Sequence, residues 1–135
     1  HETVYARGHF DAVVSRYAIH HIPHERKRAL YAAVLRFLRP GGIFVNIEHV
    51  SSPSPIYERA WNKLFIDSIS AAYGEEQSRS EAIEAYWSRQ DEATNILAPV
   101  EDQCAWLREA GFVDVDCPFK LFELAIFAGR KPNQT

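Results

Sequence analysis

The sequence has 135 residues, the length of one domain, and 47% of them are hydrophobic, which is enough for a packed core. Its 15 basic and 18 acidic residues give a net charge of −3, so we expect no nucleic-acid partner. No apolar run approaches the ~20 residues of a membrane-spanning helix, and no signal-peptide pattern opens the chain. We therefore expect a cytoplasmic protein without a membrane partner.

Residues 10–50 have the pattern of a strand, a helix and a second strand. Phe10–Ser15 is a short, Val-rich apolar run that fits a strand buried on both faces. From Pro23 to Leu38 apolar residues recur every three or four positions, which predicts a helix. Pro40–Gly42 is expected to end that helix and turn the chain, and Ile43–Val50 is a second apolar strand. Links this short favour a right-handed parallel crossover, and hence the α/β class.

The rest of the chain is predicted to add helices and a β-hairpin to this unit. A single domain is expected, with residues 10–50 as the βαβ unit, 54–93 as a two-helix insertion and 99–131 as a helix plus a hairpin. The expected elements are helices over 56–73, 78–93 (with Ser78 and Glu81 as a capping box) and 100–110, then strands over 112–117 and 121–129, joined by a link at Pro118–Lys120. So short a link joins antiparallel neighbours.

The aromatic pair Tyr86 and Trp87 in the insertion fits either core packing or a lid or oligomer surface. Cys104 and Cys117 fall in a predicted helix and a predicted strand, so we expect free buried thiols rather than a disulfide.

Polar residues follow the carboxyl ends of the two central strands, where ligands bind in open parallel sheets. The second strand ends in Asn46, Glu48 and His49, and alternation places His49 on the face opposite the other two. Glu48 and His49 fit a proton acceptor and a group that positions a substrate. Polar side chains that leave a strand for solvent are the more common explanation of such a pattern.

His20, His21 and His24 invite comparison with a zinc site that Glu48 or His49 would complete. Adjacent histidines point in different directions in any regular element, and the i, i+4 pair of a metalloprotease helix is absent. We therefore expect no metal site and favour histidines that hydrogen-bond the backbone at a helix entry.

Three segments carry a resemblance to a known family. They are FDAVVSRYAIHHI (10–22), LRPGGIFVNIEHV (38–50) and WLREAGFVDVDCPFKLFELAIFAGRKP (106–132). In this order and spacing they resemble the C-terminal half of class I S-adenosylmethionine-dependent methyltransferases. The resemblance implies a partial Rossmann-like sheet that holds strands four to seven of the family in the order 4-5-7-6, with the last strand antiparallel.

The resemblance also implies the roles of individual residues. S-adenosylmethionine is the implied cofactor, and the residues after the first strand would line its pocket: Ser15, Arg16, Tyr17 and His20. The two-helix insertion and the hairpin would cover a small-molecule acceptor, through Tyr57, Trp61, Phe119 and Lys120. Glu48, His20 and His49 are the expected catalytic bases.

The Gly-rich loop and the acidic ribose-binding residue of the family would lie upstream of Phe10. We therefore expect the isolated chain to bind S-adenosylmethionine weakly or not at all. The strand Phe10–Ser15 would also lack its usual neighbour, and an exposed edge favours pairing with a second copy of the chain.

Two hypotheses of function follow. One is methyl transfer from S-adenosylmethionine to a small molecule, with this chain as the substrate-side half of the enzyme. The other is a non-catalytic module, related to a methyltransferase, that forms homo-oligomers or binds a partner. Whether the chain itself is an enzyme stays open at this point.

Overall fold

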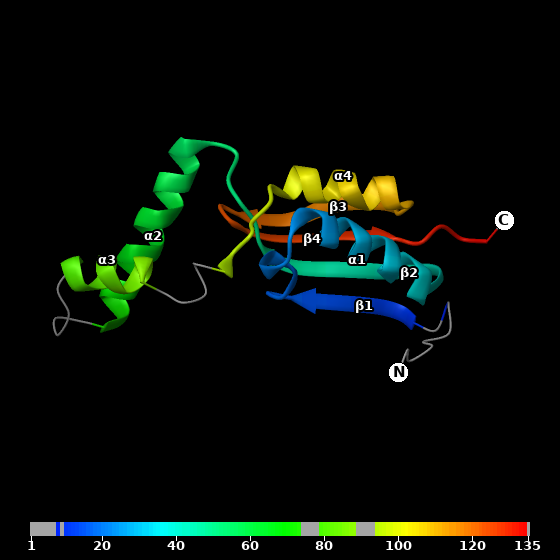
Figure 1. Cartoon of the computed structure of the whole chain (residues 1–135), viewed down its shortest axis with the longest axis horizontal. Coiled ribbons are helices and arrows are strands. Elements are labelled where there is room, and N and C mark those ends of the chain that lie inside the picture. Colours follow the sequence, from blue (N-terminus) through cyan, green and yellow to red (C-terminus); the bar gives the residue numbers. More distant parts are fainter. Residues whose placement is uncertain (1–7, 9, 74–78, 89–93, 135) are drawn as a thin grey trace.

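The computed structural model describes residues 8, 10–73, 79–88 and 94–134. None of the helices in these ranges is both long and apolar enough to cross a membrane. The elements, shown in Figure 1, are in chain order β1 (Phe10–Arg16), a 3₁₀ turn η1 (Ile19–His21), α1 (His24–Phe37), β2 (Leu38–His49), α2 (Pro55–Tyr73), α3 (Arg79–Trp87), α4 (Val100–Ala110), β3 (Val113–Leu121) and β4 (Leu124–Arg130).

The four strands form one mixed sheet in the order β1-β2-β4-β3. β1 and β2 are parallel, and α1 makes the crossover between them. β4 is antiparallel to both of its neighbours and lies between β2 and β3. The last strand is therefore inserted antiparallel inside the sheet, as predicted, and the α/β class is confirmed.

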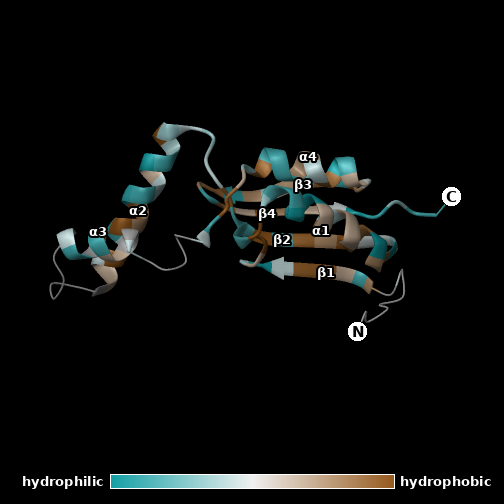
Figure 2. Cartoon of the chain, viewed as in Figure 1, coloured by the Kyte–Doolittle hydropathy of each residue, from teal (hydrophilic) through white to brown (hydrophobic). Residues whose placement is uncertain are grey.

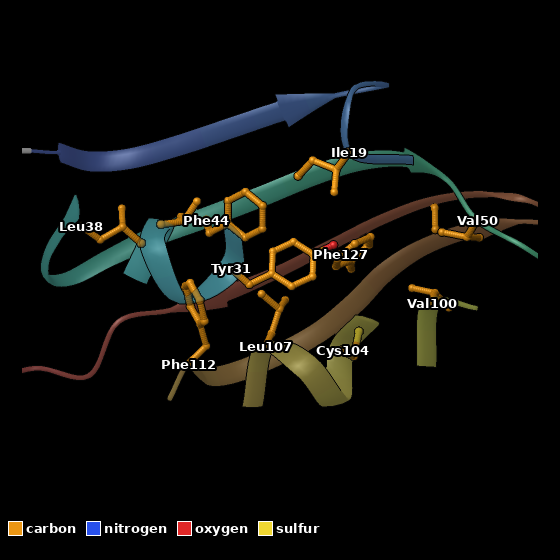
Figure 3. Packing of buried hydrophobic residues seen from close by; sticks show 12 residues of the cluster. Ile19, Tyr31, Leu38, Phe44, Val50, Val100, Cys104, Leu107, Phe112 and Phe127 are labelled. Atoms are coloured by element: carbon orange, nitrogen blue, oxygen red, sulfur yellow. The ribbon is translucent and has the colours of Figure 1, made fainter. Parts of the chain in front are cut away.

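Helices α1 and α4 pack on one face of the sheet and enclose the hydrophobic core (Figures 1 and 3). Tyr31 of α1 is fully buried, and its ring centroid lies 5.7 Å from that of Phe44 and 6.5 Å from that of Phe127. Leu107 of α4 belongs to the same buried cluster (Figure 3). Helices α2 and α3 lie beyond the end of the sheet (Figure 1).

The second face of the sheet is apolar but largely uncovered. In β2 the even-numbered residues from Gly42 to Glu48 are buried and the odd-numbered ones are not. The strand register places Val14, Phe119 and Leu121 on this second face, where they are 64%, 50% and 46% exposed. Figure 2 shows that β1 and β2 are predominantly hydrophobic.

The start of β2 differs from the prediction. The helix ends at Phe37 and the strand begins at Leu38, so Pro40–Gly42 lies inside β2 and not before it. Phe10 pairs with Leu38 but Ala12 with Ile43, which leaves residues 39–42 as a bulge. Gly41 takes a positive φ of 76° there, which glycine adopts without strain.

The hairpin turn also lies elsewhere than predicted. Pro118–Lys120 is part of β3, and the link is the two-residue turn Phe122–Glu123. β3 is an edge strand, and Pro118 is tolerated there because its missing N–H need not serve a neighbouring strand. A register shift between Asp116 and Phe119 accommodates it.

Helices α2 and α4 confirm their predictions almost to the residue, and α4 ends at Gly111 with a φ of 111°. The predicted helix over 78–93 is found as α3, whereas Ser78 of its proposed capping box and residues 89–93 lie outside the described residues. Cys104 and Cys117 are free thiols, as expected, but only Cys104 is buried; Cys117 is half-buried.

Candidate functional site

The carboxyl ends of β1 and β2 bring His20 and Glu48 together. His20 lies in η1, just after β1, and Glu48 is the second-last residue of β2. Nδ1 of His20 lies 2.5 Å from Oε1 of Glu48, and both side chains are buried. Because a carboxylate only accepts hydrogen bonds, Nδ1 donates to Glu48 and Nε2 is the nitrogen left with a basic lone pair.

Glu48 is fully buried, so the interpretation in which the strand-end side chains reach solvent is wrong for it. Strand alternation turns Asn46 and Glu48 inward, onto the face that α1 and α4 cover. The carboxylate is satisfied there by three donors: His20, the Nδ2 of Asn46 at 3.4 Å and the backbone N–H of His49 at 3.0 Å. Buried charge persists only where such donors compensate its lost hydration.

A buried polar layer continues from Glu48 beneath α1 and α4. Tyr31 Oη donates to Gln103 Oε1 at 2.6 Å, and Gln103 Nε2 donates to the carbonyl of Ala98 at 3.0 Å. Burial, with the charge of Glu48 second, raises the pKa of Tyr31 far above its ordinary value, so the phenol stays protonated. Oδ1 of Asn46 is buried without a hydrogen-bond partner among the described residues.

His49 points away from Glu48, as alternation predicted. Its Nε2 lies 2.9 Å from Oε2 of Glu123, so it ties the end of β2 to the turn of the β3–β4 hairpin. The rings of His20 and His49 still meet edge to face, with centroids 6.0 Å apart. His20, Glu48 and His49 therefore form one cluster, in which only His20 and Glu48 share a hydrogen bond between side chains.

The histidine triplet is not gathered around a metal position. Nδ1 of the exposed His21 lies 3.3 Å from Oγ1 of Thr94, and His24 packs against Trp106 with ring centroids 5.4 Å apart. Among the described residues no three His, Cys, Asp or Glu side chains are arranged to hold a metal ion.

A pocket of about 450 Å³ opens beside the end of β2, where the chain passes into α2. Tyr57 and Lys120 are on its wall, whereas His20 and Glu48 are not. Its lining residues are Ser51, Ser52, Pro53, Ser54, Tyr57, Pro99, Val100, Glu101, Lys120, Leu121 and Phe122.

Comparisons with known proteins show which fold the chain resembles. Residues 1–46 match the family described as "Methyltransferase domain". An O-methyltransferase family protein from Burkholderia thailandensis superposes with a TM-score of 0.61 at 13% identity, over 97% of this chain and 33% of that one. The S-adenosylmethionine-dependent methyltransferase SibL gives 0.59 at 19% identity, over 95% and 33%. Human N-acetylserotonin methyltransferase, in complex with S-adenosylmethionine, gives 0.56 at 13% identity, over 91% and 30%.

The chain has the fold of part of a methyltransferase domain. It spans about a third of the length of these solved structures. No curated protein sequence matches it significantly.

The residues that the methyltransferase resemblance assigned to the donor pocket lie at the end of β1 and in the η1 turn that follows it. Tyr17 is 41% exposed and has a positive φ of 48°, and its N–H donates to the carbonyl of Ile47. The guanidinium of Arg16 lies 5.4 Å from the centroid of the Tyr17 ring. A non-glycine residue held at positive φ beside a strand end is a recurrent feature of ligand sites.

The four residues assigned to acceptor binding are not all in one place. Tyr57 and Lys120 line the pocket. Trp61 is buried, and its ring packs against Phe65 and Phe122 at centroid distances of 5.6 and 6.3 Å. Phe119 lies on the uncovered face of the sheet.

Sequence reasoning missed Lys27, Tyr31 and Gln103 as members of the polar layer. Lys27 is fully buried, and it stands three and four residues before Leu30 and Tyr31 on the apolar stripe of α1. A lysine inside an apolar helical stripe indicates a buried cation, so the sequence alone could have pointed to Lys27.

Proposed function

We propose that this chain is the substrate-side part of an enzyme that transfers a methyl group from S-adenosylmethionine to a small-molecule acceptor. The observation that carries the proposal is the buried pair of His20 and Glu48 at the carboxyl ends of two parallel strands. A fold-level likeness supports methyl transfer in general, and this pair supplies the chemistry.

The pair is suited to general base catalysis. Glu48 holds Nδ1–H of His20, fixes the tautomer and stabilises the imidazolium that forms when Nε2 takes a proton. S-adenosylmethionine, when bound, supplies a methyl group on a positively charged sulfur. His20 would take the proton that the acceptor atom loses on receiving the methyl group.

The end of β1 fits one side of a donor pocket. Arg16 offers a guanidinium for a carboxylate, Tyr17 an exposed aromatic surface for a ring or a cation, and Ser15 a hydroxyl. These are groups that an amino-acid tail and a nucleoside require. We therefore keep Ser15, Arg16 and Tyr17, with His20, as the proposed donor-binding residues.

Tyr57 and Lys120 are the proposed acceptor-binding residues that the pocket supports. The lining of the pocket does not include His20. We therefore assign the pocket to the body of an acceptor and not to the acceptor's reacting atom.

Calorimetric titration of the chain with S-adenosylhomocysteine tests the donor assignment directly. A dissociation constant near 1 μM, about −8 kcal/mol, would support a donor site in this chain or in an assembly of it. Absence of heat would remove donor binding from the isolated chain.

Conservative variants test the base. We expect Glu48→Gln and His20→Gln to lower turnover by about 10²–10⁴-fold, the usual contribution of general base catalysis, when the chain is assayed with a donor-binding half. Glutamine at position 20 still donates to Glu48, which avoids leaving a buried charge unpaired. Glu25→Gln, on the exposed first turn of α1, is the control. Unchanged turnover in both site variants would remove the pair from the reaction.

A second candidate function rests on a different observation. β1 is the terminal strand of the described sheet, and the apolar face beside it is exposed at Val14. This favours a non-catalytic module that pairs with a second copy through the β1 edge. A monodisperse monomer in light scattering at micromolar concentration would contradict it.

A further inference from the structure

Lys27 is a fully buried lysine in the first turn of α1 that the proposed reaction does not use. Burial lowers the pKa of its ammonium group, because desolvation disfavours the charged form, and the negative charge of Glu48 opposes that shift. Burying an ammonium group is unfavourable unless its donors are engaged. The position of its acceptors therefore indicates what the lysine does.

The ammonium joins two segments that are far apart in the sequence. Nζ donates to the carbonyl of Ile22 at 2.6 Å and to the carbonyl of Ile96. Ile22 directly follows η1, the turn that carries His20. Ile96 belongs to residues 94–98, here named the return segment, which leads from the inserted helices α2 and α3 back to α4.

The return segment is tied to the same turn by its own backbone. The N–H of Ile96 donates to the carbonyl of His20 at 2.8 Å, and Oγ1 of Thr94 lies 3.3 Å from Nδ1 of His21. Both polar groups of the Ile96 backbone are thus engaged, one by His20 and the other by Lys27. The peptide that carries His20 is held between α1 and the return segment.

We propose that Lys27 is a positioning residue that locks the return segment of the helical insertion onto the η1 turn, and so fixes the imidazole of His20 against Glu48. The inference rests on the proposed function for the role of His20, and on the contacts alone for the lock. Lys27 would thus link the segment that follows the inserted helices to the turn that carries His20.

The test compares Lys27→Met, which keeps the length of the side chain but removes its donors, with Lys27→Arg, which keeps donors and charge. Arg28→Met is the matched control, because Arg28 is the next residue of α1 and its ion pair with Glu109 is exposed. Two quantities are measured by NMR on the chain. They are the hydrogen-exchange rate of the Ile96 amide and the ring-nitrogen chemical shifts of His20, whose ring faces Glu48, His21 and His49.

In Lys27→Met we expect the Ile96 amide to exchange at least roughly tenfold faster, as local opening becomes easier. We expect the ring-nitrogen chemical shifts of His20 to move as the ring loses its fixed geometry against Glu48. Lys27→Arg should restore part of the protection, and Arg28→Met should change neither quantity.

The proposal is overturned if a folded Lys27→Met protein keeps the wild-type exchange rate at Ile96 and the wild-type ring-nitrogen chemical shifts of His20. If Lys27→Met does not fold, Lys27→Gln replaces it, because its amide donors reach one carbonyl at most. Unfolding of both, with Arg28→Met folded, would assign Lys27 to stability alone and equally overturn the proposal.

Neither measurement depends on methyl transfer. A lock that behaves as expected in a protein without methyltransferase activity would leave the positioning role intact and remove the proposed function. Methyltransferase activity that depends on His20 but not on Lys27 would support the proposed function and remove the positioning role of Lys27.

Discussion

At the scale of single residues, burial decides the chemistry of the titratable groups. Glu48 and His20 are buried as a hydrogen-bonded pair, so each compensates the desolvation of the other. Cys104 is also buried, and burial raises the pKa of its thiol to about 11. Burial also raises the pKa of Cys117, which is only half-buried.

The shifted pKa of Cys104 predicts a dependence of stability on pH. The unfolded thiol ionises near its ordinary pKa of 9.0, whereas the folded thiol stays neutral up to about pH 11. The stabilisation is therefore complete below pH 9 and is lost as the pH rises from 9 to 11, by about 2–3 kcal/mol.

Urea unfolding of the wild type and of Cys104→Ala at pH 8 and pH 10.5 measures this loss. The difference between the two proteins isolates the thiol from other groups that titrate in the same range. Equal losses of stability in both proteins would show that Cys104 does not carry the effect.

At the scale of elements, β2 organises the molecule, because it pairs with β1 on one side and β4 on the other. Its carboxyl end carries Glu48 and His49, and its start contains the bulge of residues 39–42. The bulge allows the chain to leave α1 and enter the sheet without a separate loop.

The bulge predicts a strict requirement for glycine at position 42. A Cβ there would lie 2.9 Å from the carbonyl oxygen of Arg39 and 3.0 Å from that of Asp11, and neither backbone atom can move aside cheaply. We expect Gly42→Ala to destabilise the protein by about 1–3 kcal/mol, the usual cost of overpacking.

Thermal or urea unfolding measures this change. Asp114→Gly is the reciprocal control, because Asp114 is exposed and has a positive φ of 50° that glycine adopts freely. It should leave stability unchanged or raise it. A Gly42→Ala protein as stable as the wild type would show that the bulge adjusts without strain.

At the scale of the whole molecule, the sheet is covered on one face and largely bare on the other. Val14 is 64% exposed near the middle of β1, on the uncovered face and at the sheet's terminal strand. An exposed apolar strand edge of this kind favours association.

We expect the chain to form dimers or larger assemblies, and Val14→Lys to shift it toward monomer by placing a charge in the contact. Light scattering across a concentration series measures the shift. Ile56→Lys is the control, because Ile56 is 68% exposed on α2, away from the sheet. Equal effects of the two substitutions would show that association does not depend on the β1 edge.

Much of the fold could be predicted because its signals are local. The acidic first turn of α4 and Gly111, which ends the helix, are such local signals, and they predict a helix over Val100–Ala110. The hairpin was misplaced for the same reason: Pro118 is a strong local turn signal, but only the sheet order shows that it stands on an edge strand, where it is tolerated.

The candidate site was predictable as a set of residues but not as a set of contacts. Alternation along β2 correctly put Glu48 and His49 on opposite faces. It could not say that α1 and α4 cover the face of Glu48, nor that His20, 28 positions away, supplies the partner. The burial of Lys27 likewise depends on the return segment, 69 positions away.

By itself, the sequence determined the α/β class, the βαβ unit, the helical insertion and free thiols, because periodicity, caps and turn residues act over a few positions. The tertiary structure alone decided that Glu48 is buried against His20, that Lys27 is enclosed, and that the hairpin turns at Phe122–Glu123. Those outcomes depend on which segments the sheet order brings together, and on how much water their packing excludes.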